Sequence, residues 1–61
     1  MKRFPDSANV YDSLGEAYEN NEQFELAQKN FTKACELAKE DDPNFSVFKK
    51  NLERMQKKLA E

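Results

Sequence analysis

Three carboxylates near the start of the chain have the spacing to act together. Asp12, Glu16 and Glu19 recur at steps of four and three, so in a helix they share one face. Catalysis or calcium binding would need further ligands from elsewhere, and the spacing of an EF-hand loop is absent. We interpret the three residues as a solvated surface. A partner-binding face and a metal site are the alternatives.

The other reactive side chains do not complete a catalytic set. The chain has no histidine, the residue that most readily transfers protons near neutral pH. Cys35 has apolar neighbours and is interpreted as a small buried side chain, with a reactive or cross-linking thiol as the alternative. Ser13 stands in the string DSLG, which lacks the Gly-x-Ser-x-Gly motif of hydrolases. We therefore expect a non-catalytic protein without a cofactor or a metal.

Length and composition restrict the class of protein. Sixty-one residues allow one small domain or a piece of a larger one. A single cysteine excludes a disulfide framework, and the lack of histidine excludes a His-containing zinc site. No apolar run approaches the ~20 residues of a membrane span. No apolar run of signal-peptide length follows Lys2 and Arg3. We expect a soluble, cytoplasmic chain.

Charge is distributed unevenly although the net charge is only −2. Residues 6–25 carry acidic groups and no Lys or Arg, whereas residues 49–58 carry basic groups and only one acidic residue. Two solvated helix faces would explain this, as would a polarised molecule whose ends attract each other or another copy. The basic segment is short and lacks interleaved aromatic residues, so we expect no nucleic-acid binding. Because its apolar stripe is needed to cover a second helix, we expect no membrane binding either.

The apolar periodicity predicts three helices and hence an all-α fold. In the first, at about residues 8–20, an oxygen of Asp6 or Ser7 is expected to cap the start. Asn20-Asn21 is expected to end it, because asparagine tolerates the left-handed conformation. One predicted face comprises Tyr11, Leu14, Gly15 and Tyr18. An adjoining apolar edge comprises Val10, Leu14 and Ala17.

The second helix is predicted at about residues 23–40 and the third at about 45–60. Asp41-Asp42-Pro43 is expected to stop the second helix. The third begins either with Asp42 as its cap and Pro43 at the first helical position, or with Asn44 as its cap. The apolar face of the second helix comprises Phe24, Ala27, Phe31, Ala34 and Ala38. That of the third comprises Phe45, Phe48, Leu52, Met55 and Leu59.

Gly15 is the only glycine of the chain. In a helix interior it costs about 0.8–1 kcal/mol relative to alanine. A close helix crossing explains its presence, because a bulky residue of the second helix can then approach the backbone. We expect Phe31 to be that residue, with Ala27 and Ala34 making room beside it.

The order and spacing of these residues resemble the tetratricopeptide repeat, in which an aromatic residue, Leu-Gly and Tyr are followed by Ala, an aromatic residue and Ala. The matching residues are Tyr11, Leu14, Gly15, Tyr18, Ala27, Phe31 and Ala34, with Phe24 at a position where the family favours an aromatic residue. The resemblance covers about residues 8–41. It implies a single repeat followed by a C-terminal capping helix at residues 45–60. Residues 1–7 then form the tail of a preceding repeat or a linker, because Phe4-Pro5-Asp6-Ser7 looks like a repeat's closing loop.

Two departures from the family pattern concern the turns. Glu22 stands where the family often has a glycine between its helices, so Asn20 or Asn21 is expected to supply the tight conformation. The closing proline of the family would fall near Lys39, whereas here it is Pro43. This difference implies a second helix about one turn longer than usual.

The resemblance also implies a function. Tetratricopeptide arrays bind peptides on a concave surface lined by their first helices. One subset of the family binds C-terminal carboxylates through basic residues and asparagines, but Asp12 and Glu16 stand in the corresponding region here. A neutral or basic protein or peptide is therefore the expected partner. The concave face carried over to this chain comprises Asn9, Asp12, Ser13, Glu16, Glu19 and Asn20.

Three functions are compatible with the sequence. The first is a protein-interaction module. The second is the structural terminal cap of a larger bacterial enzyme, because FPDSANVYDSLGEAY is similar to repeats appended to bacterial hydrolases. The third is an engineered minimal repeat without a ligand.

A homodimer is expected on packing grounds. In an array, Val10 and Ala17 would pack against a preceding repeat, and one repeat with a cap falls below the ~3 repeats usually needed for stability. Exchange of the third helix, or stacking of the first helices about a two-fold axis, would each bury the apolar edge. Attraction between the acidic first helix and the basic third helix would add to either arrangement.

Overall fold

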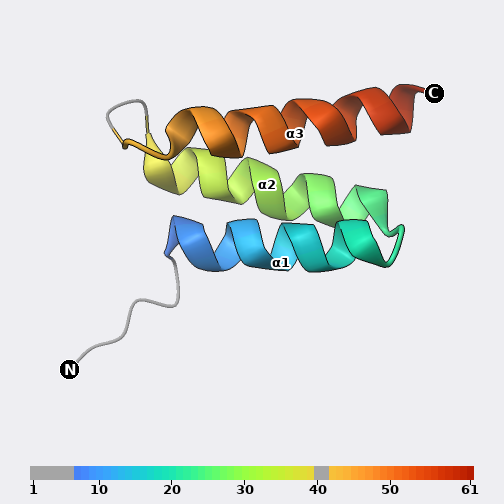
Figure 1. The fold of residues 1–61 in the computed structure, drawn as a ribbon, viewed down its shortest axis with the longest axis horizontal. Helices are drawn as coiled ribbons and strands as arrows, with labels where there is room; N and C mark the ends of the chain where they lie inside the picture. The colour runs from blue at the N-terminus through green and yellow to red at the C-terminus, as the bar shows by residue number, and fades with distance from the viewer. Residues whose placement is uncertain (1–6, 40–41) are drawn as a thin grey trace.

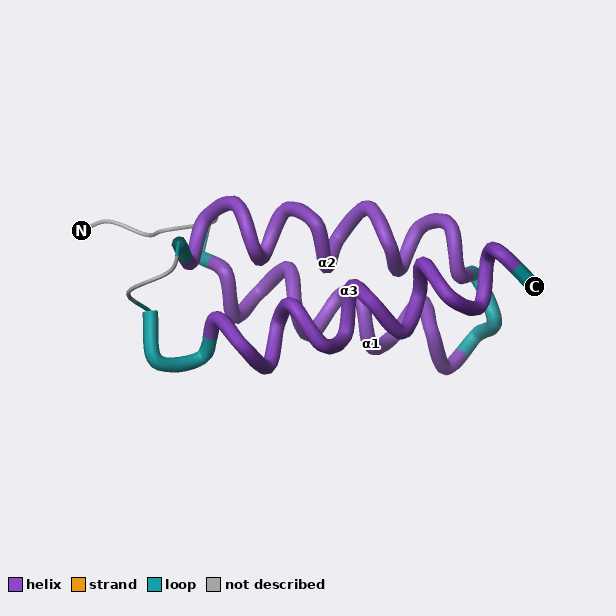
Figure 2. The backbone as a smooth tube through the Cα atoms, turned by 90° about the horizontal axis from the view of Figure 1, so that it is seen from above, coloured by secondary structure: helices purple, strands orange, loops and turns teal. Residues whose placement is uncertain are grey.

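The computed structural model describes residues 7–39 and 42–61. These residues form three helices and no strand, so the predicted all-α fold is confirmed. The helices are α1 (Ala8–Asn20), α2 (Phe24–Ala38) and α3 (Phe45–Ala60). They alternate in direction, with α2 between α1 and α3 (Figure 1). Seen from above, α2 is displaced from the other two, which lie on the same side of it (Figure 2).

The crossing of α1 and α2 is built around Gly15. The glycine is buried, and the Phe31 side chain is fully buried against it. The contact expected between these two residues is present: an ideal Cβ placed on Gly15 would stand 2.5 Å from Cε1 of Phe31. Ala27 and Ala34 are fully buried on the same face of α2. Small side chains on both helices thus allow the close approach of the two backbones.

The core consists of two clusters along α2, each completed by one residue of α3. Met55 packs with Ala27 and Phe31, and Tyr18, Phe24 and Leu52 lie against this cluster. Phe48 packs with Ala34 and Ala38, and the side chains around that second cluster are Ala8, Tyr11, Cys35 and Phe45. Four residues of the predicted α3 stripe therefore pack in or against these clusters along α2: Phe45, Phe48, Leu52 and Met55.

The start of α1 differs from the predicted cap. Ser7 occupies the N-cap position, but its side chain makes no capping hydrogen bond. Its backbone carbonyl instead accepts hydrogen bonds from the amides of Val10 and Tyr11, at 3.0 and 3.3 Å. The alternative cap, Asp6, and the predicted N-terminal tail up to that residue lie outside the described residues.

The turn between α1 and α2 corrects a second prediction. Asn21 has a φ of −91°, whereas Glu22 takes the left-handed conformation with a φ of 63°. The amide of Gln23 donates to the carbonyl of Tyr18 and that of Glu22 to the carbonyl of Glu19, both at 2.9 Å. These two bonds form a Schellman motif, whose left-handed position is usually glycine. The tight conformation therefore falls on Glu22 itself and not on either asparagine.

The end of α2 also falls earlier than predicted. The helix stops at Ala38, so the expected extension to residue 40 and the extra turn are not found. Lys39 leaves the helical region with φ 64° and ψ 171°, while its amide still donates to the carbonyl of Cys35. The helix thus ends ahead of the segment Asp41-Asp42-Pro43, of which Asp41 lies outside the described residues.

The start of α3 resolves the alternative left open above. Asn44 occupies the N-cap position without a side-chain capping bond. Asp42 supplies the local hydrogen bond: its Oδ1 accepts from the amide of Asn44 at 2.7 Å. The Asp42 carbonyl accepts from the amide of Phe45 at 3.0 Å. An aspartate turn therefore precedes the helix, with Asn44 as the last residue before it.

Candidate interaction surfaces

α3 contacts two of the six residues predicted for the concave face of α1. Asp12 and Glu19 are half-buried and hydrogen-bond to α3. The other four predicted residues of that face are exposed: Asn9, Ser13, Glu16 and Asn20. The six residues therefore do not form one open peptide-binding surface, because α3 already contacts two of the three carboxylates.

Glu19 and Arg54 form a bidentate ion pair between α1 and α3. Nε and Nη2 of Arg54 donate to the two carboxylate oxygens at 2.9 and 2.7 Å. The hydrogen bond from Arg54 is the main cause that lowers the pKa of Glu19, and burial opposes it. The same bond raises the pKa of Arg54. The acidic first helix and the basic third helix therefore attract each other within one molecule at this pair.

Asn51 is a residue whose role the sequence did not indicate. It is only 7% exposed, and its Nδ2 donates to Oδ1 of Asp12 at 2.8 Å. The available signal was its position: it lies three residues after Phe48 and four before Met55, on the edge of the apolar stripe of α3. A buried polar residue needs a hydrogen-bond partner, and Asp12 is that partner.

The second apolar edge of α1 is open to solvent. Val10 is 45% and Leu14 42% exposed, and Ala17 is also exposed. Val10 and Leu14 line a shallow groove together with Asn9 and Ser13. We call these five residues the outer face of α1. Leu14 was also predicted on the inward face with Gly15; this is wrong, because with Gly15 at the crossing, Leu14 is turned about 100° away from α2.

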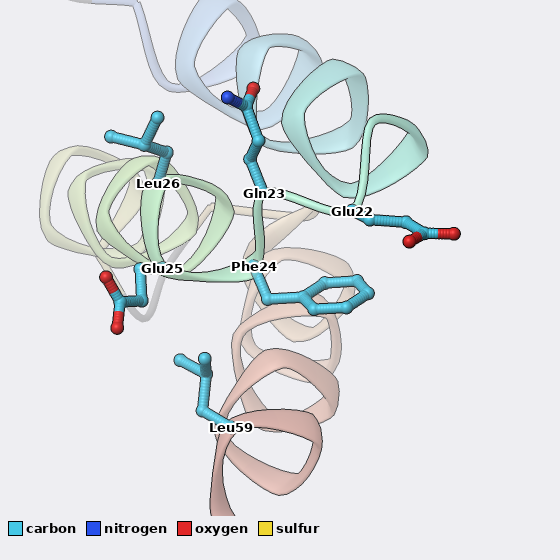
Figure 3. A pocket seen from close by; sticks show the side chains of 6 residues that line it. All are labelled: Glu22, Gln23, Phe24, Glu25, Leu26 and Leu59. Atoms are coloured by element: carbon cyan, nitrogen blue, oxygen red, sulfur yellow. The ribbon is translucent and has the colours of Figure 1, made fainter.

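A second shallow pocket lies where α2 begins and α3 ends (Figure 3). Leu26 and Leu59 are each 39% exposed there. Leu59 belongs to the apolar stripe of α3 and was predicted to be covered by packing; this prediction is wrong. Nζ of Lys58 lies 5.2 Å from the centre of the Phe24 ring. The pocket is lined by Glu22, Gln23, Phe24, Glu25, Leu26 and Leu59.

Cys35 is half-buried beside the cluster of Ala34, Ala38 and Phe48. Burial is the main cause that raises the pKa of its thiol, and the negative charge of Asp12 acts in the same direction. A raised pKa leaves less of the reactive thiolate at neutral pH. Cys35 therefore packs beside this cluster, although it is half-buried and not fully buried as predicted.

Two further properties concern residues 7–39 and 42–61. Within these ranges, no three His, Cys, Asp or Glu side chains are grouped so that they could hold a metal ion. None of the three helices has the length and apolar character needed to cross a bilayer.

Comparisons with family models, with curated proteins and with solved structures give no match. The resemblance to the tetratricopeptide repeat therefore stays a resemblance.

Proposed function

We propose that this chain is a cytoplasmic, non-catalytic protein-interaction module of the tetratricopeptide type, whose partner packs on the outer face of α1. The hairpin geometry supports the type, because Gly15 and Phe31 meet at the crossing in the register of the repeat pattern. The single observation that carries the proposal is the exposure of Val10 and Leu14 on adjacent turns, facing away from α2.

The apolar content of the outer face suits a helical or extended protein segment. Fully burying a Val or Leu side chain contributes about 1.5–3 kcal/mol, so Val10 and Leu14 can anchor a weak complex. Asn9 and Ser13 line the same groove and offer polar groups that can fix the orientation of a partner.

The charge beside the outer face favours a neutral or basic partner. Glu16 is exposed and Asp12 is half-buried on the same helix, whereas the charge of Glu19 is compensated by Arg54. An acidic C-terminal tail would meet the like charge of Glu16 and Asp12, which raises the free energy of approach. We expect no measurable binding of such a tail, even at low salt.

The occupant of the outer face depends on the context of the chain. In a longer chain, a preceding repeat covers it, and the module is then a terminal cap. The packing of α3 along α2, with α1 open on its other side, favours this second candidate. In the isolated chain, a second copy covers the face about a two-fold axis, which gives a homodimer.

A matched pair of valine substitutions tests the proposal. Val10 on α1 and Val47 on α3 are 45% and 50% exposed, so Lys is tolerated equally well at either site in the monomer. Sedimentation equilibrium at about 100 μM is expected to show a lower average mass for Val10→Lys than for Val47→Lys, because only Val10→Lys loses association through the outer face. Equal average masses for both variants would contradict the assignment of the outer face.

A further inference from the structure

The contact between α3 and α1 consists of two side-chain pairs in a fixed pattern. Asn51 and Arg54 lie three residues apart on α3, so they point to the same side of that helix. They donate to Asp12 and Glu19, which lie seven residues apart on α1, two turns of one helix face. The apolar contacts of α3 go mainly to α2, through Phe48 and Met55.

These two pairs can discriminate between helices that the apolar stripe alone would accept. An apolar stripe with steps of three and four repeats along a helix, so it specifies a register weakly. Asn51 is 7% exposed, and a helix without a donor at this position would leave the facing Asp12 oxygen without its partner. The fork of Arg54 matches a carboxylate at one place only. Asp12 and Glu19 therefore select the helix that docks.

Lys39, the first residue after α2, has a costly backbone conformation. Lys39 has φ 64° and ψ 171°, a region that is essentially restricted to glycine. It directly follows α2, and the sequence pattern predicts a helix that continues to residue 40. Strain in a short connection favours the exchange of the element beyond it, because the strain is released when the connection straightens.

We propose that the α1–α2 hairpin is a docking site for an amphipathic helix with Asn and Arg three residues apart beside its apolar stripe, and that this site accepts α3 of a second copy by exchange. In the exchanged dimer, the partner copy supplies Asn51 and Arg54 to Asp12 and Glu19, and Lys39 takes a helical conformation. The exchange goes beyond the proposed function, because it uses Asp12 and Glu19 and leaves the outer face of α1 free. The two surfaces can therefore be tested separately.

A pair of charge reversals tests the exchange. Glu19→Arg and Arg54→Glu each place like charges between α1 and α3 of the same chain. When the two variants are mixed, the exchanged heterodimer restores opposite charges at both sites. Native mass spectrometry of an equimolar mixture is expected to show the heterodimer favoured over the homodimers by about tenfold beyond the statistical ratio.

Two controls fix the interpretation. The doubly substituted chain, with Glu19→Arg and Arg54→Glu together, pairs internally. Mixed with the unmodified chain, it is expected to give the reverse result, with homodimers favoured. Lys39→Gly removes the cost of the strained conformation from the monomer, so its dimer fraction is expected to fall by about fivefold at equal concentration.

Statistical mixing of the two charge-reversed variants would overturn the exchange. If Val10→Lys then abolished that dimer, the outer face would still be the association surface and the proposed function would stand. A chain that stays monomeric in the unmodified form and in every mixture would overturn both the exchange and the self-association.

Discussion

The ring edge of Phe31 occupies the space in which a β-carbon on residue 15 would stand. An ideal Cβ on Gly15 lies 2.5 Å from Cε1, 2.6 Å from Cδ1 and 2.9 Å from Cζ of that ring. Real Cβ atoms do not approach other heavy atoms so closely, and Phe31 is fully buried, so the ring has no free space to move into. The separation of α1 and α2 is therefore set by the absence of a side chain at this position.

Gly15→Ala is expected to destabilise the protein although it improves helix propensity. The propensity gain is about 0.8–1 kcal/mol, and the overpacking cost of about 1–3 kcal/mol exceeds it. Gly15→Leu is expected to be worse, and Phe31→Leu to rescue part of the loss in Gly15→Ala. Thermal melts followed by circular dichroism measure these effects. A midpoint of Gly15→Leu that is unchanged or raised would show that the two helices do not meet at this residue.

Acid is expected to weaken the contact between α1 and α3. The hydrogen bond from Arg54 lowers the pKa of Glu19 from 4.5, so the ionised carboxylate is favoured in the folded state. The stabilisation of the folded state by the ionised Glu19 is fully present above pH 4.5, the value of the unfolded chain. It is lost as the pH falls through the lower pKa that Glu19 has in the folded protein. The Arg54 side chain is 44% exposed, so solvent limits the effect to less than about 1 kcal/mol.

Urea unfolding of the unmodified chain and of Glu19→Gln at about pH 7 and about pH 3 checks this. The two proteins are expected to differ more at the higher pH. An equal difference at both pH values would mean that the ion pair does not contribute to folding.

Glu22→Gly is expected to stabilise the turn between α1 and α2. Glu22 has a φ of 63° at the position of the Schellman motif where glycine is preferred. The gain is about 0.5–1 kcal/mol after allowing for the greater freedom of glycine in the unfolded chain. Glu53→Gly is the matched control: Glu53 is exposed within α3, where the same change costs about 1 kcal/mol. Equal losses in the two variants would contradict the left-handed assignment of Glu22.

Local periodicity was sufficient to predict the three helices and the contact of Gly15 with Phe31, because both depend on steps of three and four residues. It could not decide which of two overlapping apolar faces of α1 turns inward. Leu14 belongs to both faces, and only the position of Gly15 at the crossing leaves it 42% exposed. The packing partner, not the helix itself, decides that choice.

The polar contacts of α3 depend on residues far apart in the chain. Asn51 and Asp12 are separated by 39 positions, and Arg54 and Glu19 by 35. No local pattern encodes such pairs. The turns were mispredicted for a related reason: Glu22 and Lys39 take positive φ values where the helices end, although neither residue type prefers that conformation.

Cys35 is expected to react slowly with a thiol reagent at neutral pH. Its pKa is raised, mainly by burial, so the thiolate is scarce in the folded protein. When urea exposes the thiol, the labelling rate of Cys35 is expected to be several-fold higher than in the folded chain. Labelling with Ellman's reagent with and without urea measures it. A rate in the folded chain equal to that of a free cysteine would show that the thiol is accessible.

Methyl NMR during dilution tests most directly whether a second copy docks on the outer face of α1. Spectra from about 1 mM to about 10 μM follow the Val10 and Leu14 methyl groups on the outer face, with the methyl group of Met55 as an internal control because it is fully buried in the core. We expect the Val10 and Leu14 resonances to shift with concentration while the Met55 resonance stays constant. Concentration-independent Val10 and Leu14 resonances, or equal shifts at Met55, would contradict docking on the outer face.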